Sequence, residues 1–278
     1  MSMSRLREII GGIQWAFRFD NPLEILFARH VFLRKRSVVV ERSGMEVLID
    51  SEASDAMAIT EVLLDGMYDS AIHRAAEGCS TFSYLNLGAN IGAFDVRIFE
   101  LLRGRCQPIA GLAVEMNPAT HARLLLNLEL NDLHSVRAIN AAAWDTAGFT
   151  QVRIDERNTG QQCGGEGVAG GWSVPLVPWR ELFGRVVAGP VDLVKIDIEG
   201  ADRKVVPQIT EADRQRIRFL VIETHGADVQ EQVGTHLRAI GFQQESQTPG
   251  DGETWLTLWQ NPQARPPSTS PTPCEARG

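Results

Sequence analysis

Apolar and polar positions follow a regular alternation between residues 82 and 240, in which strand-like apolar runs are separated by stretches with helical periodicity. The strand-like runs are Phe82–Leu87, Ile109–Glu115, Val136–Ala141, Val191–Ile196 and Arg218–Glu223. The helical stretches are Gly92–Arg103, Pro118–Asn131, Ala201–Ile209 and Ala227–Ile240. Strands that alternate with helices of this length predict a parallel sheet covered by helices on both faces.

Two more strand-like runs, Gly241–Gln247 and Thr254–Gln260, follow the last of these helices. The segment between them is too short for a helix, so the two strands must pair antiparallel. We therefore expect an α/β fold with a mostly parallel sheet that ends in an antiparallel hairpin.

The N-terminal part has a different pattern. Leu6, Ile9, Ile10, Ile13 and Phe17 have helical spacing, and a second helical piece covers Leu23–Leu33. Ser37–Asp50 is typical of a β-hairpin that turns at Ser43-Gly44, and Glu52–His73 is helical in pattern. We interpret residues 1–80 as a helical and β-hairpin cap on a main domain at 81–260. A lid, a dimerisation arm that forms a homo-oligomer, and a membrane-surface helix are the alternatives for the first helices.

Two segments lack any regular pattern. Arg157–Trp172 contains six glycines in sixteen residues and predicts a mobile loop, which either gates a substrate or is disordered in the free protein. Residues 261–278 are rich in Pro, Ser and Thr and are expected to form a disordered tail.

Charge and composition narrow the choice of partners and compartment. The net charge is −8, which disfavours nucleic acid as a partner because phosphate binding requires a basic face. The four cysteines form no CxxC pair, so free thiols in a reducing compartment are expected. No apolar stretch is long enough to span a membrane. A cytoplasmic protein without a membrane partner is the resulting prediction.

The segment YLNLGANIGAF, residues 84–94, leads from a strand through glycines into a helix. Its glycines, Gly88 and Gly92, do not have the G-x-G-x-x-G spacing that admits the pyrophosphate of NAD. Glu115 ends the next strand, where an acid accepts both hydroxyls of a ribose. Ala142 and Trp144 follow the third strand and are placed to flank an adenine. An adenosine without a diphosphate satisfies this pattern, and S-adenosylmethionine is such a molecule.

A second group of chemically active residues lies at the ends of two later strands. Alternation points Lys195, Asp197 and Glu199 to one side, and Glu223 and His225 end the following strand. Three interpretations stay open. Asp197, Glu199 and Glu223 hold a divalent cation such as Mg²⁺, or His225 or Asp197 is a general base with Lys195 orienting the carboxylate. Otherwise Lys195 pairs with Asp197 for structure, and Glu199 favours the start of the next helix.

Four segments in order resemble the FkbM family of S-adenosylmethionine-dependent methyltransferases: YLNLGANIGAF, AVEMNPATHARLLLNLELN, VDLVKIDIEGAD and LVIETHG. The likeness extends from about Ser37 to Gln260. It implies a class I, Rossmann-like fold with a seven-stranded sheet, and methyl transfer to the hydroxyl of a small natural product or a sugar-containing metabolite. N-methylation of an amine and a non-catalytic binding protein on the same fold are the alternatives.

The resemblance also implies roles for single residues. Asn86, Gly88, Asn90 and Gly92 would contact the methionine part of the cofactor, and Glu115 the ribose. Asn117, Ala142 and Trp144 would lie on the adenine side. Asn86 departs from the family pattern, in which an acid is usual at this position, so we expect binding of the methionine amine without charge assistance.

Overall fold

The computed structural model describes residues 3–30, 36–41, 43–51, 53–152, 172–186, 189–250 and 252–264. Its centre is a seven-stranded sheet with the order β11-β12-β10-β9-β3-β4-β5. These strands are β3 (Phe82–Leu87), β4 (Ile109–Glu115), β5 (Val136–Asn140), β9 (Val191–Ile196), β10 (Ile217–His225), β11 (Gln243–Pro249) and β12 (Thr254–Gln260). The predicted strands are thus confirmed to within a few residues at their ends.

The five central and outer strands from β10 to β5 are all parallel. β12 pairs antiparallel with both β10 and β11, so the predicted antiparallel hairpin at the end of the sheet is confirmed. Every residue of β3 and β9 is buried, as expected of parallel strands with helices on both faces.

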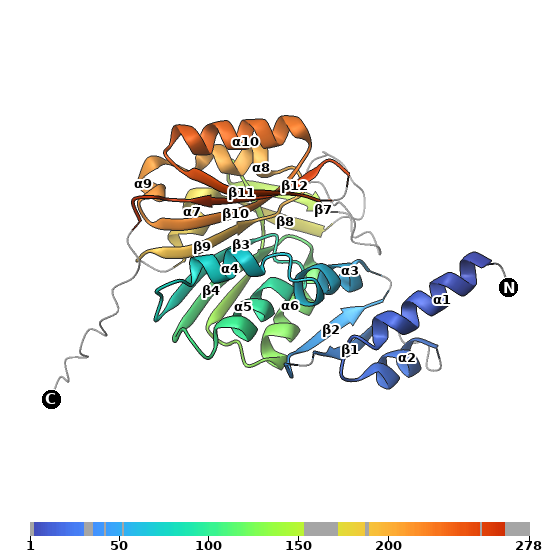
Figure 1. Cartoon of the computed structure of the whole chain (residues 1–278). Helices are drawn as coiled ribbons and strands as arrows, with labels where there is room; N and C mark the ends of the chain where they lie inside the picture. The colour runs from blue at the N-terminus through green and yellow to red at the C-terminus, as the bar shows by residue number, and fades with distance from the viewer. Residues whose placement is uncertain are drawn as a thin grey trace.

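Helices cover both faces of this sheet (Figure 1). One face carries α4 (Asp69–Ala75), α5 (Ala93–Leu102) and α6 (Pro118–Leu130), and the other carries α8 (Asp202–Val205) and α10 (Ala227–Ala239). Three short elements complete this part: α7 (Trp179–Gly184), the 3₁₀ turn η2 (Val206–Gln208) and α9 (Glu211–Arg214). The sheet and its helices form the three-layer α/β fold that the sequence predicts.

The N-terminal elements extend from one side of the sheet (Figure 1). They are α1 (Met3–Ala16), α2 (Pro22–His30) and the antiparallel hairpin of β1 (Arg36–Val40) and β2 (Glu46–Asp50). The hairpin is joined to α6 by Asn127 and Asn131, whose side-chain oxygens accept from the N–H groups of Leu48 and Glu46. One continuous hydrophobic core contains residues of both the hairpin and β3, and the domain boundary near residue 80 stays a prediction.

The helix expected over Glu52–His73 is wrong in its continuity, because the segment breaks into three pieces. These are α3 (Asp55–Ile59), the π-helical turn η1 (Thr60–Leu64) and α4. The break before α4 contains Gly66 with φ +68°, a conformation that a continuous helix does not allow. The break matters because it brings Tyr68 to the sheet, as described below.

A small second sheet was not expected from the sequence. It consists of β6 (Ala142–Trp144), β7 (Gly148–Val152) and β8 (Trp172–Pro178), in the order β6-β8-β7. The glycine-rich segment expected to be a mobile loop joins β7 to β8, and apart from Trp172 it lies outside the described residues. Asn261, the first residue of the expected tail, is buried and donates to the carbonyl oxygens of Arg214 and Ile217. Residues 265–278 lie outside the described part.

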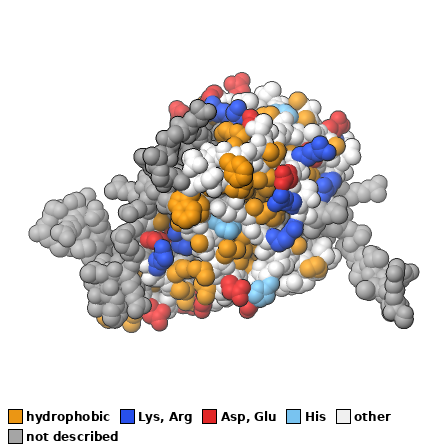
Figure 2. All heavy atoms as spheres, turned by 180° about the vertical axis from the view of Figure 1, so that it is seen from behind, with side chains coloured by type: hydrophobic (Ala, Val, Ile, Leu, Met, Phe, Trp, Pro, Cys, Tyr) orange, Lys and Arg blue, Asp and Glu red, His pale blue; other side chains and the backbone are white. Residues whose placement is uncertain are grey.

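The described helices are too short or too polar for a membrane span. On the face opposite to that of Figure 1, hydrophobic side chains are interspersed with side chains of both charges (Figure 2).

Candidate active site

A cavity of about 420 Å³ opens at the carboxyl ends of the central parallel strands. Ligands bind at this edge of open α/β sheets, because the strand–helix turns there leave room and free backbone groups. Its lining comes from the ends of β3, β4 and β9 and from the small sheet. Of the predicted site residues it includes Gly88, Asn90, Glu115, Asn117, Ala142, Trp144, Asp197 and Glu199.

Gly88 makes the turn after β3 with φ +78°. A Cβ at this position would lie 1.7 Å from the carbonyl oxygen of Asp197, so only glycine permits this approach of the two strand ends. The N–H of Gly88 donates to the carbonyl oxygen of Val114 at 3.0 Å, and its own carbonyl accepts from Nζ of Lys195 at 2.9 Å. The glycine thus joins three strand ends at the floor of the cavity.

Glu115 ends β4 and faces the cavity. Its Oε2 accepts the N–H of Asn90 at 2.9 Å, and its Oε1 accepts the N–H of Asn117 at 2.7 Å. Burial raises the pKa of this carboxyl, and the two backbone donors offset part of that effect. Each oxygen has a further lone pair, so the carboxylate can accept two hydroxyl groups in addition.

Asn117 has a local structural task besides its place in the lining. Its Oδ1 accepts the N–H groups of Ala119 and Thr120, which caps α6 just before Pro118. Trp144 and Ala142 line the side formed by β6, and the carbonyl oxygen of Trp144 accepts from Nε2 of Gln208. This wall consists of small and aromatic side chains.

Asn86 and Gly92, two of the residues assigned to the methionine part, do not line the cavity. Asn86 is fully buried, and its Nδ2 donates to Oδ2 of Asp95 on α5 at 2.8 Å. Gly92 has φ +87°, and a Cβ there would lie 2.7 Å from Cδ1 of Leu124. The structure thus places both residues behind the cavity wall, where they support the turn and the start of α5.

Lys195 and Asp197 come together at the end of β9. Nζ of Lys195 lies 3.1 Å from Oδ2 of Asp197, and the lysine is almost fully buried. The ammonium lies 5.5 Å from the ring centroid of Tyr68 and 5.9 Å from that of Phe94. Aromatic faces of this kind stabilise a buried cation. Lys195 therefore holds the Gly88 turn and the Asp197 carboxylate in one arrangement.

The remaining predicted residues gather beside this pair. Nε2 of His225 lies 3.9 Å from Oε2 of Glu199 and 3.9 Å from Oε1 of Glu223. Oε2 of Glu223 accepts from the hydroxyl of Tyr68 at 3.3 Å. Burial, followed by the charge of Asp197, raises the pKa of Glu223 to about 7. Burial also raises the pKa of Glu199. A carboxyl that titrates near neutral pH is suited to proton transfer.

The placement of Glu199 by alternation of side chains along a strand is wrong, because Glu199 does not lie on a strand. β9 ends at Ile196, and Glu199 reaches the cavity through a tight turn in which its own φ is +49° and that of Gly200 is +84°. Within the described ranges, no three His, Cys, Asp or Glu side chains form a group that could hold a metal ion. The arrangement of Asp197, Glu199 and Glu223 therefore gives no support to the Mg²⁺ alternative.

Three side chains at or near this edge were not identified from the sequence. Tyr68 arrives from the break before α4, and Asp95 lies buried on α5 behind Asn86. Asp202 begins α8 and is fully buried. The only signal for Asp95 was an acid in a largely apolar stretch, and Asp202 gave none because polar residues follow it. Tyr68 gave none because its segment was assigned to a helix.

Comparison with known proteins identifies the family. A model of the Methyltransferase FkbM domain matches residues 86–248, which is more than half of the chain. No curated protein matches. Because the family model spans the glycine turn, Glu115 and both later strand ends, it includes every predicted site residue.

Several solved structures are similar to parts of the chain at low identity. The FkbM methyltransferase of Methylobacillus flagellatus KT is 14% identical with a TM-score of 0.49, and the match covers 65% of this chain and 44% of that one. Fibrillarin of Aeropyrum pernix, solved with natively bound S-adenosyl-L-methionine, is 10% identical with a TM-score of 0.44 and coverages of 81% and 94%. A precorrin-6y C5,15-methyltransferase of Geobacter metallireducens GS-15 is 11% identical with a TM-score of 0.41 and coverages of 69% and 86%. At these levels the solved structures bear on neither the substrate nor the role of any residue.

The family model agrees with the resemblance stated from the sequence. The chain belongs to the FkbM family of S-adenosylmethionine-dependent methyltransferases.

Proposed function

We propose that the protein transfers a methyl group from S-adenosylmethionine to a hydroxyl of a small natural product or a sugar-containing metabolite. One observation carries this proposal. The cavity that contains Gly88, Glu115 and Trp144 also contains Asp197 and Glu199. His225 lies beside Glu199 and beside Glu223. A nucleoside-binding wall and a group of proton acceptors thus share one edge of the sheet.

The residues present suit the cofactor. Glu115 has free lone pairs for the two ribose hydroxyls, and the Gly88 turn leaves backbone close to the cavity without a side chain. Ala142 and Trp144 offer a flat apolar surface for the adenine. When bound, S-adenosylmethionine supplies an electrophilic methyl group on a sulfonium.

The chain itself must then position the acceptor and remove its proton. The acceptor oxygen forms a bond to the methyl carbon while the bond from that carbon to sulfur breaks, and the hydroxyl proton passes to a base. We assign that base to the neighbouring pair of Glu223 and His225. Glu223 titrates near neutral pH and is half-buried, so the proton has a short route to it. The products are the methyl ether, S-adenosylhomocysteine and the protonated base.

N-methylation of an amine is a second candidate. The acidic character of Asp197, Glu199 and Glu223 at one edge would attract an ammonium group, which must then lose its proton before it attacks. A panel of matched alcohols and amines separates the two reactions. A non-catalytic binding protein would bind the cofactor and methylate neither class.

The deciding experiment offers a labelled methyl donor to hydroxylated and aminated metabolites, with and without a chelator. Label in an alcohol acceptor supports the proposal, label in amines alone replaces it with the second candidate, and label in neither contradicts both. Loss of label with chelator would restore the metal alternative.

Cofactor binding is tested separately by thermal unfolding with S-adenosylhomocysteine. A ligand at one hundred times its Kd stabilises a protein by about 2.7 kcal/mol, which raises the melting temperature measurably. Glu115→Gln should abolish this rise. Glu129→Gln is the matched control, because its carboxylate lies on the exposed side of α6, 77% accessible, and should leave the rise intact. If S-adenosylhomocysteine does not raise the melting temperature of the wild-type protein, the assignment of the cavity as the cofactor site is wrong.

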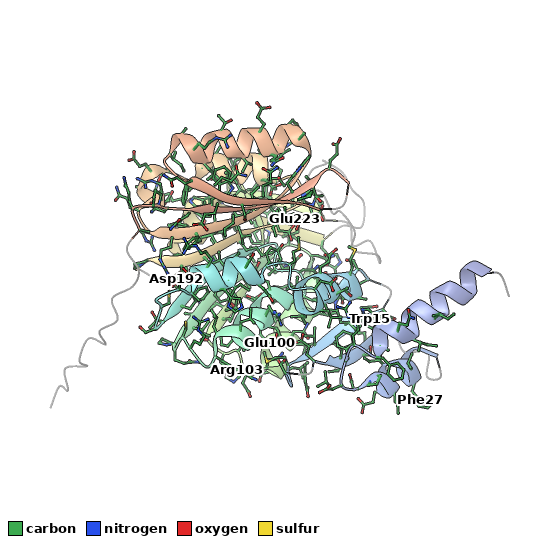
Figure 3. The ribbon with its side chains drawn as sticks, in the orientation of Figure 1. Trp15, Phe27, Glu100, Arg103, Asp192 and Glu223 are labelled. Carbon is green, nitrogen blue, oxygen red and sulfur yellow. The ribbon has the colours of Figure 1, made fainter. Side chains whose placement is uncertain are left out.

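The oligomer predicted from the sequence is part of this proposal. Phe17, Leu23 and Phe27 are more than half exposed on and around α1 and α2, and Figure 3 labels Phe27 on the outer side of α2. Apolar side chains gathered in this way often mark a contact between proteins. Sedimentation of Phe17→Ser/Phe27→Ser against wild type checks it, and a monomeric wild-type protein would contradict it. Cytoplasmic location stays a prediction from the sequence, which cell fractionation tests.

A further inference from the structure

Asp202 presents an unusual feature of the site region. The side chain is fully buried, and within the described part of the chain neither Oδ1 nor Oδ2 makes a hydrogen bond of normal geometry, although the backbone N–H groups of Gly200 and Asp202 lie near enough to lower its pKa. A buried polar atom without a partner costs about 1–3 kcal/mol, and a carboxylate costs more. Such a group therefore indicates a partner that arrives or closes in another state of the protein.

His225 presents the complementary feature. Its Nδ1 is buried and, among the residues that the structure describes, has no hydrogen-bond partner. Its other ring nitrogen, Nε2, lies 3.9 Å from carboxylate oxygens of both Glu199 and Glu223. Nε2 thus lies toward the cavity edge, beyond hydrogen-bond distance of both carboxylates, whereas Nδ1 is buried away from them.

The fold brings these two groups to the same place. Asp202 begins α8 directly after the tight turn at Glu199 and Gly200. His225 is the last residue of β10 and is followed at once by α10, which packs on α8. Ala201 and Arg203 line the cavity, whereas Asp202 between them does not. The carboxyl therefore lies behind the lining, on the side from which α8 meets α10.

Electrostatics links the two side chains as well. Burial, followed by the charge of Asp197, raises the pKa of Asp202 to about 7, and the charge of His225 acts in the opposite direction. The groups are therefore near enough for each to sense the charge of the other. The carboxyl of Asp202 is an acceptor when ionised, and a neutral imidazole with its proton on Nδ1 is a donor.

We propose that Asp202 is the positioning residue of His225: its carboxylate accepts a hydrogen bond from Nδ1–H, directly or through one buried water molecule. This bond fixes the tautomer in which Nε2 is unprotonated and faces the acceptor. The pair closes when the acceptor occupies the site, since catalytic hydrogen bonds are often long in free enzymes and shorten in the complex. The same division of tasks between an acid and an imidazole operates in hydrolytic triads.

The proposal rests on the proposed function for the role of Nε2, but its main test does not need turnover. ¹⁵N spectra of the imidazole side chains report the tautomer of each histidine, and His225→Gln identifies the signal of His225. In the wild-type protein with S-adenosylhomocysteine and either the acceptor alcohol or its methyl ether present, His225 should carry its proton on Nδ1. A proton on Nε2 in the wild-type protein overturns the proposal, and this measurement requires no folded variant at position 202.

Asp202→Asn should move the signal toward the Nε2–H tautomer. Its kcat should fall by about 10- to 100-fold, a part of what a general base contributes, while KM and S-adenosylhomocysteine binding stay close to wild type. An unchanged tautomer together with unchanged kcat would overturn the proposal. If no acceptor is methylated by the wild-type protein, the proposed function fails, and the tautomer measurement still decides the pairing.

Asp192→Asn is the matched control for loss of a buried carboxylate. Asp192 lies toward the other end of the strands from Glu223 (Figure 3), where its Oδ1 accepts from Nη1 of Arg218 at 2.8 Å. This variant should be destabilised, because it weakens a buried ion pair, yet it should leave the His225 tautomer and kcat unchanged. If Asp192→Asn and Asp202→Asn lose kcat equally, the loss at Asp202 comes from lower stability and not from positioning of His225.

Discussion

Nδ2 of Asn86 donates a hydrogen bond to Oδ2 of Asp95 over 2.8 Å, and both side chains are fully buried. Oδ1 of Asp95 accepts from the hydroxyl of Tyr84, also at 2.8 Å. Burial raises the pKa of Asp95 to about 6, while these two donors and the charge of Lys195 act against the rise. The amide at position 86 therefore binds a carboxylate on the neighbouring helix.

This relationship predicts that Asn86→Asp is destabilising. The change would place two carboxyl groups at 2.8 Å in a buried site, where one uncompensated charge costs about 3–5 kcal/mol. Two carboxylates this close cannot both ionise without a large cost, so the loss should be large at pH 8 and smaller at pH 5, where one proton bridges the two groups. Urea unfolding at the two pH values measures it.

The control for this variant is the exchange Asn86→Asp/Asp95→Asn. It restores one amide and one carboxyl to the pair, so most of the lost stability should return. If Asn86→Asp is as stable as the wild-type protein at pH 8, the amide at position 86 is not needed to stabilise the buried carboxylate of Asp95.

Gly88→Ala should affect both stability and ligand binding. The residue has φ +78°, and an added Cβ would lie 1.7 Å from the carbonyl oxygen of Asp197. Left-handed strain of about 1–2 kcal/mol and overpacking of about 1–3 kcal/mol predict a loss of about 2–5 kcal/mol. The thermal shift with S-adenosylhomocysteine should disappear as well, since the cavity floor must move. Gly104→Ala, with nothing within 4 Å of its Cβ, should change neither quantity, and a wild-type shift in Gly88→Ala would refute the prediction.

Tyr68→Phe tests the link between the N-terminal region and the proposed base. The hydroxyl of Tyr68 donates to Glu223 at 3.3 Å and so favours the charged carboxylate. Its removal should raise the pKa of Glu223 above about 7, which moves the acid limb of the kcat/KM profile to higher pH. A hydrogen bond to a charged group is worth about 1.5–3 kcal/mol, so a shift of about one unit is the expected order.

The chain has two tyrosines, and the second provides the control. Tyr84→Phe also removes a buried phenol donor from a carboxylate, but that carboxylate is Asp95 on α5. It should lower stability without moving the acid limb. Identical profiles for Tyr68→Phe and wild type would remove Glu223 from the proton transfer.

The sequence predicted the parts of this molecule that depend on local pattern. Mainly apolar runs such as Phe82–Leu87 are buried on both faces. Gly88 and Glu115 lie in the cavity because strand ends meet at one edge of a parallel sheet. Residues whose position depends on long-range packing were placed less well. Asn86 lies within the matched motif, but its direction depends on Asp95, which alternation along the strand does not reveal.

Turns limited the prediction in a second way. Glu199 was assigned by period-two alternation although the strand ends at Ile196, and it reaches the cavity through positive φ values at Glu199 and Gly200. Tyr68 was not identified because its segment has a helical pattern throughout. In the folded chain a π-helical turn and Gly66 interrupt this helix before Tyr68. Tertiary contacts determine where a helix is interrupted in this way, so the helical pattern of the sequence does not predict the interruption.

Glu41 offers a test of stability far from the cavity. The side chain is 7% exposed, and burial, followed by the charge of Glu100, raises its pKa to about 7. Because the folded-state pKa lies above the ordinary value of 4.5, its contribution to stability is present below pH 4.5 and is lost as the pH rises through 7. Glu41→Gln keeps the shape of the side chain and can still donate a hydrogen bond to Glu100, but the new side chain carries no charge. Figure 3 labels Glu100. The variant should therefore match wild type near pH 4.5 and exceed it at pH 8 by on the order of 1–3 kcal/mol. Denaturant unfolding at pH 4.5 and pH 8 measures this difference in stability, and the exposed Glu129→Gln is the control. If Glu41→Gln stabilises the protein equally at both pH values, the buried charge is not the cause.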